Sequence, residues 1–106
     1  MRNTGLHLAV AVLTALAACS AHAGDKALGE YLSAECVACH QLTGRYDGIP
    51  PIVGLPDPTF IQIMTEYRAR KRPNAVMQTF AARLSDEEIA ALAAYFGSIT
   101  SQPTMQ

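Results

Sequence analysis

The stretch Cys36-Val37-Ala38-Cys39-His40 decides the fold of this 106-residue chain. Two residues separate the two cysteines, and a histidine follows the second cysteine directly. Before them, apolar side chains recur at helical spacing from Lys26 to about Cys36, which predicts a helix ending at the thiols. After them, residues 41–58 hold three glycines and four prolines, a density that excludes a long helix.

The N-terminus carries the features of a secretory leader. A positive start is followed by an apolar run, Leu6 to Ala18, that is too short to span a bilayer. Ala21-His22-Ala23 is a small-x-small cleavage site, so we expect a signal peptide over 1–23 and a periplasmic domain over 24–106. In an alternative reading, residues 16–19 form a lipobox, and lipidation of Cys19 would anchor the domain to a membrane.

Cysteines at this spacing, followed by histidine, are a strong signal for covalent attachment of one haem c. Thiols near a helix end can reach two vinyl groups on one porphyrin edge, and His40 is then turned toward the iron. A disulfide-exchange pair would need a βαβ setting, and structural zinc would need four ligands. After removal of the leader, only Cys36, Cys39 and His40 remain among the cysteines and histidines.

The candidates for a second axial ligand are methionines, since no other histidine remains in residues 24–106. Met64 lies on the apolar face of an expected helix, where methionine usually fills core space. Met105 lies in the C-terminal tail. Met77 follows Pro73 in what we expect to be a loop between helices, so we predict Met77 as the ligand. The alternative is that Met77 only packs and the iron is five-coordinate.

The remaining pattern predicts an all-α domain with long irregular loops. A helix should start with Asp57 as N-cap and Pro58 in its first position, and run to about Lys71. The last helix should begin at a capping box formed by Ser85 and Glu88. A domain this small buries little surface, and a haem would supply the missing core.

The charge of the domain argues against nucleic acid as a partner. Residues 24–106 hold seven Lys and Arg against nine Asp and Glu, a formal net charge of −2. Four cations nevertheless cluster, at Arg68, Arg70, Lys71 and Arg72. They are either a solvated helix end, where cations favour the helix dipole, or a surface for a partner.

The order of these features resembles class I cytochromes c over nearly the whole of residues 24–106. The matching segments are the helix ending in Cys36-x-x-Cys39-His40, Pro50-x-Ile52-x-Gly54, Met77, and Leu84 to Ile89 with Ala94-Tyr95-Phe96. The resemblance implies three to four helices around one haem, with the first and last helices crossing. It also implies that the Pro50 carbonyl accepts a hydrogen bond from His40. Gln41 departs from the glycine of many members.

Shorter segments look like the cytochrome subunit of flavocytochrome c sulfide dehydrogenases. They are residues 31–36, 40–41, 48–54 and 72–78. This resemblance implies an electron-accepting subunit, without catalytic residues of its own, beside an FAD-containing flavoprotein. The alternatives are a free-standing periplasmic electron shuttle or the haem subunit of another sulfur-compound dehydrogenase. A ligand-binding or peroxidatic haem protein would require that Met77 leave the iron open.

Overall fold

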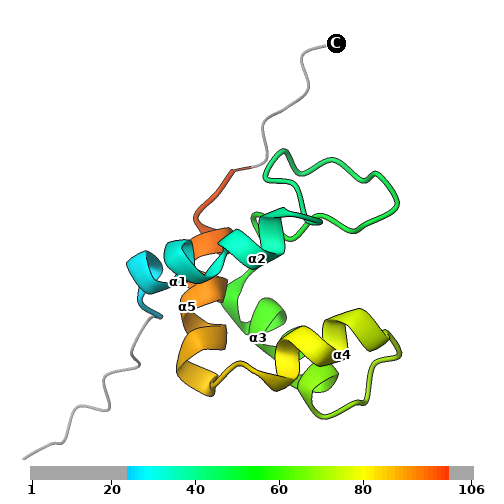
Figure 1. The fold of residues 1–106 in the computed structure, drawn as a ribbon. Coiled ribbons are helices and arrows are strands. Elements are labelled where there is room, and N and C mark those ends of the chain that lie inside the picture. Colours follow the sequence, from blue (N-terminus) through cyan, green and yellow to red (C-terminus); the bar gives the residue numbers. More distant parts are fainter. Residues whose placement is uncertain (1–23, 101–106) are drawn as a thin grey trace, which may run out of the picture.

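The computed structural model describes residues 24–100. Their regular structure is helical throughout, which confirms the predicted all-α class. The chain forms α1 (Lys26–Leu32), α2 (Ala34–Val37), α3 (Asp57–Arg68), α4 (Ala75–Ala82) and α5 (Asp86–Gly97). Figure 1 shows α5 behind α1, with α3 and α4 below the long loop that follows α2.

The helix expected from Lys26 to Cys36 is divided into α1 and α2 at Ser33. The Ser33 hydroxyl donates to the Glu30 carbonyl at 2.7 Å. A serine side chain that bonds the backbone in this way competes with the regular helical ladder. As a result, Cys36 lies in the short helix α2 and Cys39 follows the end of that helix.

Two details of α3 differ from the prediction. Asp57 is its first helical residue and Pro56 occupies the N-cap position without a side-chain cap, so the predicted Asp57 cap is wrong. The helix also ends at Arg68 rather than near Lys71. It ends there because the chain turns back in a Schellman motif, in which the Lys71 N–H donates to the Glu66 carbonyl at 2.8 Å.

The expectation that Met77 lies in a loop is wrong, because Met77 belongs to α4. Asn74, directly after Pro73, caps this helix. Its side chain accepts a hydrogen bond from the Met77 N–H at 3.0 Å. An asparagine in this position satisfies one of the helix's unpaired N–H groups and allows a helix to start where the proline ended the previous one.

The predicted capping box of α5 is confirmed. The Ser85 hydroxyl accepts from the Glu88 N–H at 3.2 Å, and the Glu88 carboxylate accepts from the Ser85 N–H at 2.8 Å. The helix then buries one face, formed by Ile89, Ala91, Leu92, Ala93 and Phe96. A fixed start therefore sets which side of α5 enters the core.

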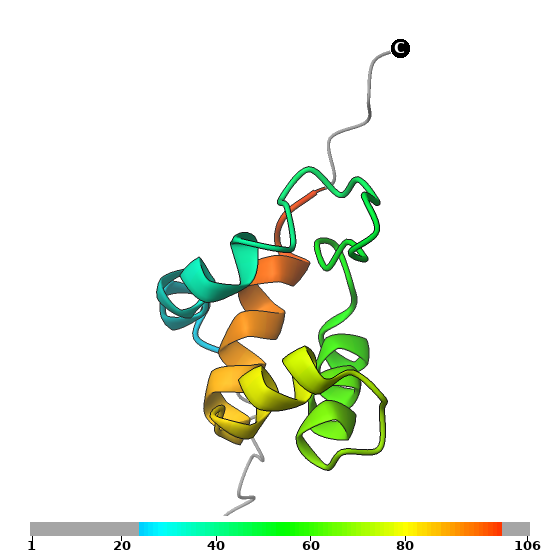
Figure 2. The ribbon, with the colours of Figure 1, turned by 45° about the vertical axis from the view of Figure 1, so that its right-hand side comes forward.

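The first and last helices cross, as the resemblance implied, and they do so at a glycine. α1 packs on α5 where a Cβ atom at Gly29 would overlap the Ala91 carbonyl and lie 2.8 Å from the Tyr95 Cβ. The second view shows the same crossing (Figure 2). Only a residue without a side chain allows the two backbones to approach so closely.

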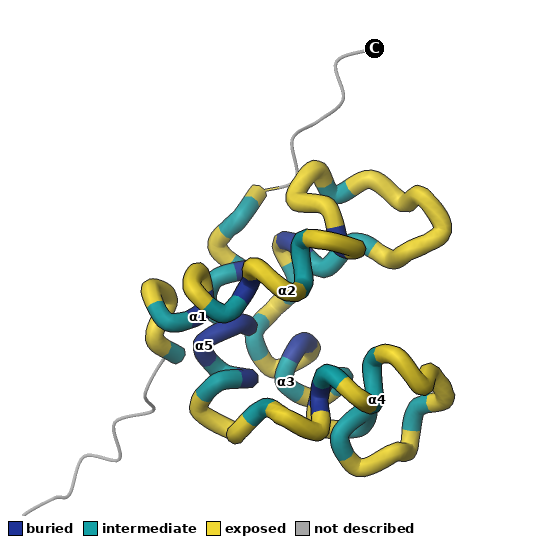
Figure 3. Tube along the Cα trace, in the orientation of Figure 1, coloured by how far each residue is buried: buried dark blue, intermediate teal, exposed yellow. Residues whose placement is uncertain are grey.

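The core lies between α3 and α5, and Figure 3 shows the buried residues gathered there. Phe60 of α3 stacks on Phe96 of α5 with ring centroids 5.9 Å apart. The long loop over 38–56 is tied to this core, because the Gly54 N–H donates to the Phe96 carbonyl at 2.9 Å. As predicted, this glycine- and proline-rich segment contains no helix.

Candidate functional site

A cavity of about 430 Å³ opens among the helices. Its size is within the range of pockets that hold small molecules and cofactors. The residues named from the sequence meet there, since Cys36, Cys39, His40 and Met77 all line it. Most of the remaining wall is apolar, including Leu92 from the buried face of α5.

His40 is buried and held in one orientation. Its Nδ1 lies 2.8 Å from the Pro50 carbonyl oxygen. A carbonyl can only accept, so Nδ1 must carry the proton and donate it to this bond. The other ring nitrogen, Nε2, is then unprotonated in the neutral ring and is available to bind a metal.

The two cysteines lie one helical turn apart. The Cys39 and His40 N–H groups both donate to the Cys36 carbonyl, at 3.1 and 2.8 Å, which draws the three residues into a tight turn. Burial, followed by the charge of Glu35, raises the pKa of the Cys36 thiol above its ordinary value. The Cys39 thiol is exposed, and both cysteines are free in the structure.

Two methionines reach the cavity rather than one. Met77 of α4 is partly buried, whereas Met64 of α3 is 6% exposed and belongs to the hydrophobic core. Met64 is thus held by packing on the core, as expected from its place on the apolar helix face. Met105 lies outside the described residues.

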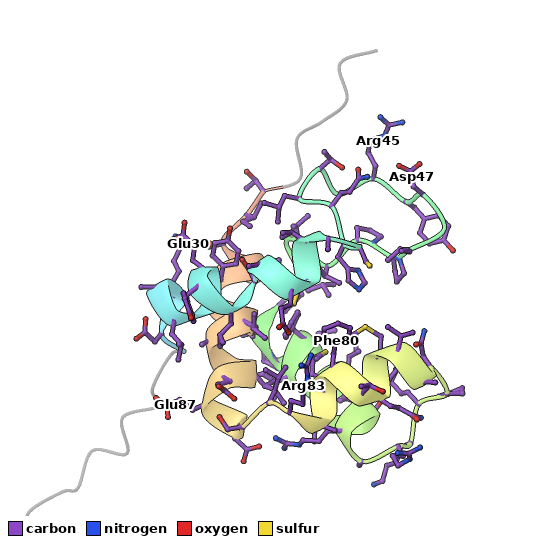
Figure 4. The ribbon with its side chains drawn as sticks, in the orientation of Figure 1. Glu30, Arg45, Asp47, Phe80, Arg83 and Glu87 are labelled. Carbon is purple, nitrogen blue, oxygen red and sulfur yellow. The ribbon has the colours of Figure 1, made fainter. Side chains whose placement is uncertain are left out.

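The rim of the cavity carries an ion pair that the sequence did not reveal. Arg83, at the end of α4, lies 3.1 Å from the Glu35 carboxylate of α2, and its guanidinium stacks 4.9 Å from the Phe80 ring centroid. Figure 4 shows Phe80 and Arg83 on the side of α4 that faces α2. Among the described helices, α2 and α4 do not pack on each other, so this pair bridges them.

The alternatives to a haem fit poorly. Within residues 24–100, no group of three or more His, Cys, Asp or Glu side chains could hold a metal ion. The same residues contain no strand, so the βαβ setting of a disulfide-exchange pair is not present in them. Two cysteines one helical turn apart and an oriented imidazole at an apolar cavity instead fit the covalent attachment of a haem.

Comparison with protein-family models matches residues 26–100 to the family described as cytochrome c. This chain belongs to the cytochrome c family. Cytochrome c-554(548) of Halomonas halodenitrificans is 40% identical, over 72% of this chain and 98% of that protein. Cytochrome c4 of Pseudomonas aeruginosa is 34% identical over 72% of the chain, which spans 39% of the length of that protein.

A third relative is named for its role. The cytochrome subunit of sulfide dehydrogenase from Chlorobaculum tepidum is 29% identical, over 70% of this chain and 68% of that protein. Membership of the family establishes that the chain is a class I c-type cytochrome that carries covalent haem c and transfers electrons. Within residues 24–100, no helix has the length and apolar character needed to cross a membrane.

Proposed function

We propose that this chain is an exported electron carrier whose haem is attached to Cys36 and Cys39 and bound at the iron by His40 and Met77. We further propose that it accepts electrons from the flavoprotein subunit of a sulfide dehydrogenase. The observation that supports the site is the meeting of these four side chains around one cavity. The bound haem supplies one-electron chemistry between ferric and ferrous iron.

His40 acts as the fixed ligand in this proposal. The 2.8 Å bond from Nδ1 to the Pro50 carbonyl restrains the ring and leaves Nε2 as the nitrogen that would bind the iron. The bond also holds the 38–56 loop against the site. Substitution of Pro50 itself leaves a carbonyl in place, so this interaction depends on loop geometry rather than on the proline ring.

Met77 is preferred over Met64 because of how each side chain is held. Met64 is fixed among core side chains, and moving it to a ligand would leave a hole beside Phe60. Met77 lies on the first turn of α4, whose start is fixed by the Asn74 cap. If His40 and Met77 both bound the iron, no position would be left for a substrate, and the haem would supply electron transfer without bond-making.

Reduction potential separates the two methionines. A thioether ligand favours ferrous iron, so Met77→Ala should lower the potential of the holoprotein clearly. Met64→Leu, which keeps an apolar side chain of similar volume, is the matched control and should leave the potential nearly unchanged. If the reduction potential fell in Met64→Leu and did not change in Met77→Ala, the ligand would be Met64 of α3 and not Met77.

The sulfide dehydrogenase role is supported by the name of the Chlorobaculum tepidum relative and by the short segments that resemble that family. Purification of the native protein tests this role. We expect it to elute with a flavin-containing subunit and to be reduced by sulfide only while that subunit is present. The role would be contradicted if the protein eluted alone and its haem stayed oxidised after sulfide and the native extract were added.

A second candidate is a free-standing electron shuttle. It is favoured by the 40% identity with cytochrome c-554(548), which this chain matches over 98% of that protein's length. Gel filtration of a native extract distinguishes the two roles. A shuttle should elute at the size of a single small domain, and a dehydrogenase subunit should elute with its larger partner.

Export is part of the proposal, because residues 1–23 lie outside the described residues. Cleavage after Ala23 would leave Gly24 as the first residue of a periplasmic protein. Lipidation would leave Cys19 first instead and would tether the domain to a membrane. Mass spectrometry of the intact exported protein separates these outcomes, since the two products differ by five residues and by the acyl chains.

A further inference from the structure

Helix α4, which carries Met77, is held to the rest of the described chain at few places. Among the described helices it packs on α3 and not on α1, α2 or α5. It lines the cavity together with α2, and Figure 1 shows the two helices on opposite sides of that space. At the far end of α4, Arg83 pairs with Glu35. The position of Met77, on the first turn, therefore depends on how the chain enters the helix.

The chain before α4 is fixed to the end of α3 by its backbone. The Arg70 N–H donates to the Tyr67 carbonyl at 3.0 Å, and the Lys71 N–H donates to the Glu66 carbonyl at 2.8 Å. Arg70 has φ 59°, the left-handed conformation that closes such a turn, and among the described residues it is the one non-glycine position with positive φ. The carbonyl of Arg72, the residue after Lys71, is thus presented from a fixed turn.

One side chain of α4 reaches back to that carbonyl. The Gln78 Nε2 donates to the Arg72 carbonyl oxygen at 2.8 Å, in a partly buried hydrogen bond. Gln78 is the fourth residue of α4. A contact between the fourth helical residue and the chain before the cap fixes the angle at which the chain enters a helix. Such contacts are usually apolar, whereas this one is a hydrogen bond that spans Pro73.

The two side-chain bonds at the start of α4 have different consequences. The Asn74 side chain accepts from the Met77 N–H, which allows the helix to begin. That bond lies within residues 74–77 and does not tie them to α3. The Gln78 bond joins α4 to the turn at the end of α3. It therefore fixes the direction in which α4 leaves the turn, and with it the position of Met77 beside the cavity.

We propose that Gln78 is a positioning residue for the Met77 ligand. Its hydrogen bond to the Arg72 carbonyl keeps α4 from turning away from the cavity. It thereby favours the state in which the Met77 sulfur is bound to the iron opposite His40. The proposal rests on the proposed ligand pair of His40 and Met77. Loss of the bond shifts the equilibrium toward an iron without Met77, which an added ligand can occupy.

Imidazole, which competes with Met77 for ferric iron, measures this equilibrium. Gln78→Glu keeps the side-chain length and nearly the same helix propensity, but a carboxylate cannot donate to a carbonyl. We expect imidazole to bind the ferric holoprotein roughly 2- to 12-fold more tightly in this variant, the factor that corresponds to one net hydrogen bond. Gln78→Arg restores a donor and should return the dissociation constant toward the wild-type value.

Two control variants separate positioning from helix stability. Thr79→Val removes a hydrogen bond of equal length, from the Thr79 hydroxyl to the Ala75 carbonyl at 2.8 Å, which lies wholly within α4. Arg72→Gln removes the side-chain pair with Glu66 but keeps the backbone carbonyl that Gln78 contacts. Both should bind imidazole with the wild-type dissociation constant, whatever change they cause in the Tm of the holoprotein.

Two results would overturn the proposal. The first is a wild-type dissociation constant for imidazole in Gln78→Glu. The second is an equal gain in affinity in Thr79→Val, which would reduce the effect to the stability of α4. Met77→Ala shows which claim has failed. If Met77→Ala binds imidazole no more tightly than the wild type, the ligand assignment and the positioning role are both wrong. If it binds more tightly and Gln78→Glu does not, the positioning role alone is wrong.

Discussion

The substitution Gly29→Ala tests the helix crossing on which the site is built. Alanine is the better helix former, by about 1 kcal/mol, so propensity alone predicts a more stable α1. The structure predicts the reverse. An added Cβ would overlap the Ala91 backbone and lie 2.8 Å from the Tyr95 Cβ, and a backbone carbonyl cannot rotate away.

The magnitude follows from the displacement that the new methyl group requires. Forcing extra atoms into a packed contact typically costs about 1–3 kcal/mol, and the gain in propensity offsets less than half of the upper value. Because the overlap is with a backbone atom, the upper value applies, and the net loss of about 2 kcal/mol should lower the Tm of a domain of this size by roughly 8–16 °C. Thermal unfolding of the holoprotein, followed by circular dichroism, measures the shift.

Ala27→Gly is the matched control, since Ala27 is exposed in the same helix. It should also lower the Tm, but by a smaller amount and through propensity alone. Two opposite exchanges in one helix should therefore both destabilise the protein. If Gly29→Ala melted at or above the wild-type temperature, α1 and α5 would not be in backbone contact, and the packing account would be wrong.

Three further tests, two of them with a control substitution, probe other parts of the molecule. Asn74→Ala removes the cap that holds the Met77 N–H and should cost about 1 kcal/mol in denaturant unfolding; no loss would mean that α4 starts elsewhere. Phe96→Ala, at a fully buried ring, should cost about 3–5 kcal/mol, whereas Tyr31→Ala, 79% exposed, should leave the unfolding midpoint nearly unchanged. The Arg83–Glu35 pair joins α4 to α2 at the rim of the cavity, so Arg83→Gln should ease entry and speed imidazole binding to the ferric haem by roughly 2- to 5-fold. This factor follows because an exposed pair contributes up to about 1 kcal/mol. Arg72→Gln, which breaks the Glu66 pair on α3, should not change that rate.

Signals carried by neighbouring residues were readable in the sequence. The Ser85 and Glu88 box lies within one turn of helix, and the loop glycines and prolines act on their own backbone. The Cys36 to His40 spacing likewise predicts that three side chains share one face of a short turn. Such features depend on local sterics and hydrogen bonds, which the order of residues specifies directly.

Features made by distant parts of the chain were not readable in this way. Nothing near Gly29 shows that Ala91 will meet it, because that contact depends on how α1 crosses α5. The Glu35–Arg83 pair joins residues 48 positions apart. The wrong prediction that Met77 lies in a loop has a local cause instead. Asn74 directly after Pro73 is a local N-cap signal, and it would have predicted the start of α4.

The absorption spectrum of the ferric holoprotein tests most directly whether Met77 completes the haem site opposite His40. A weak band near the red edge of the visible spectrum marks a bond between methionine sulfur and ferric iron. We predict this band in the wild type, its loss in Met77→Ala and its retention in Met64→Leu. A wild-type spectrum without the band, or a band that survives in Met77→Ala, would contradict the closed His40 and Met77 site.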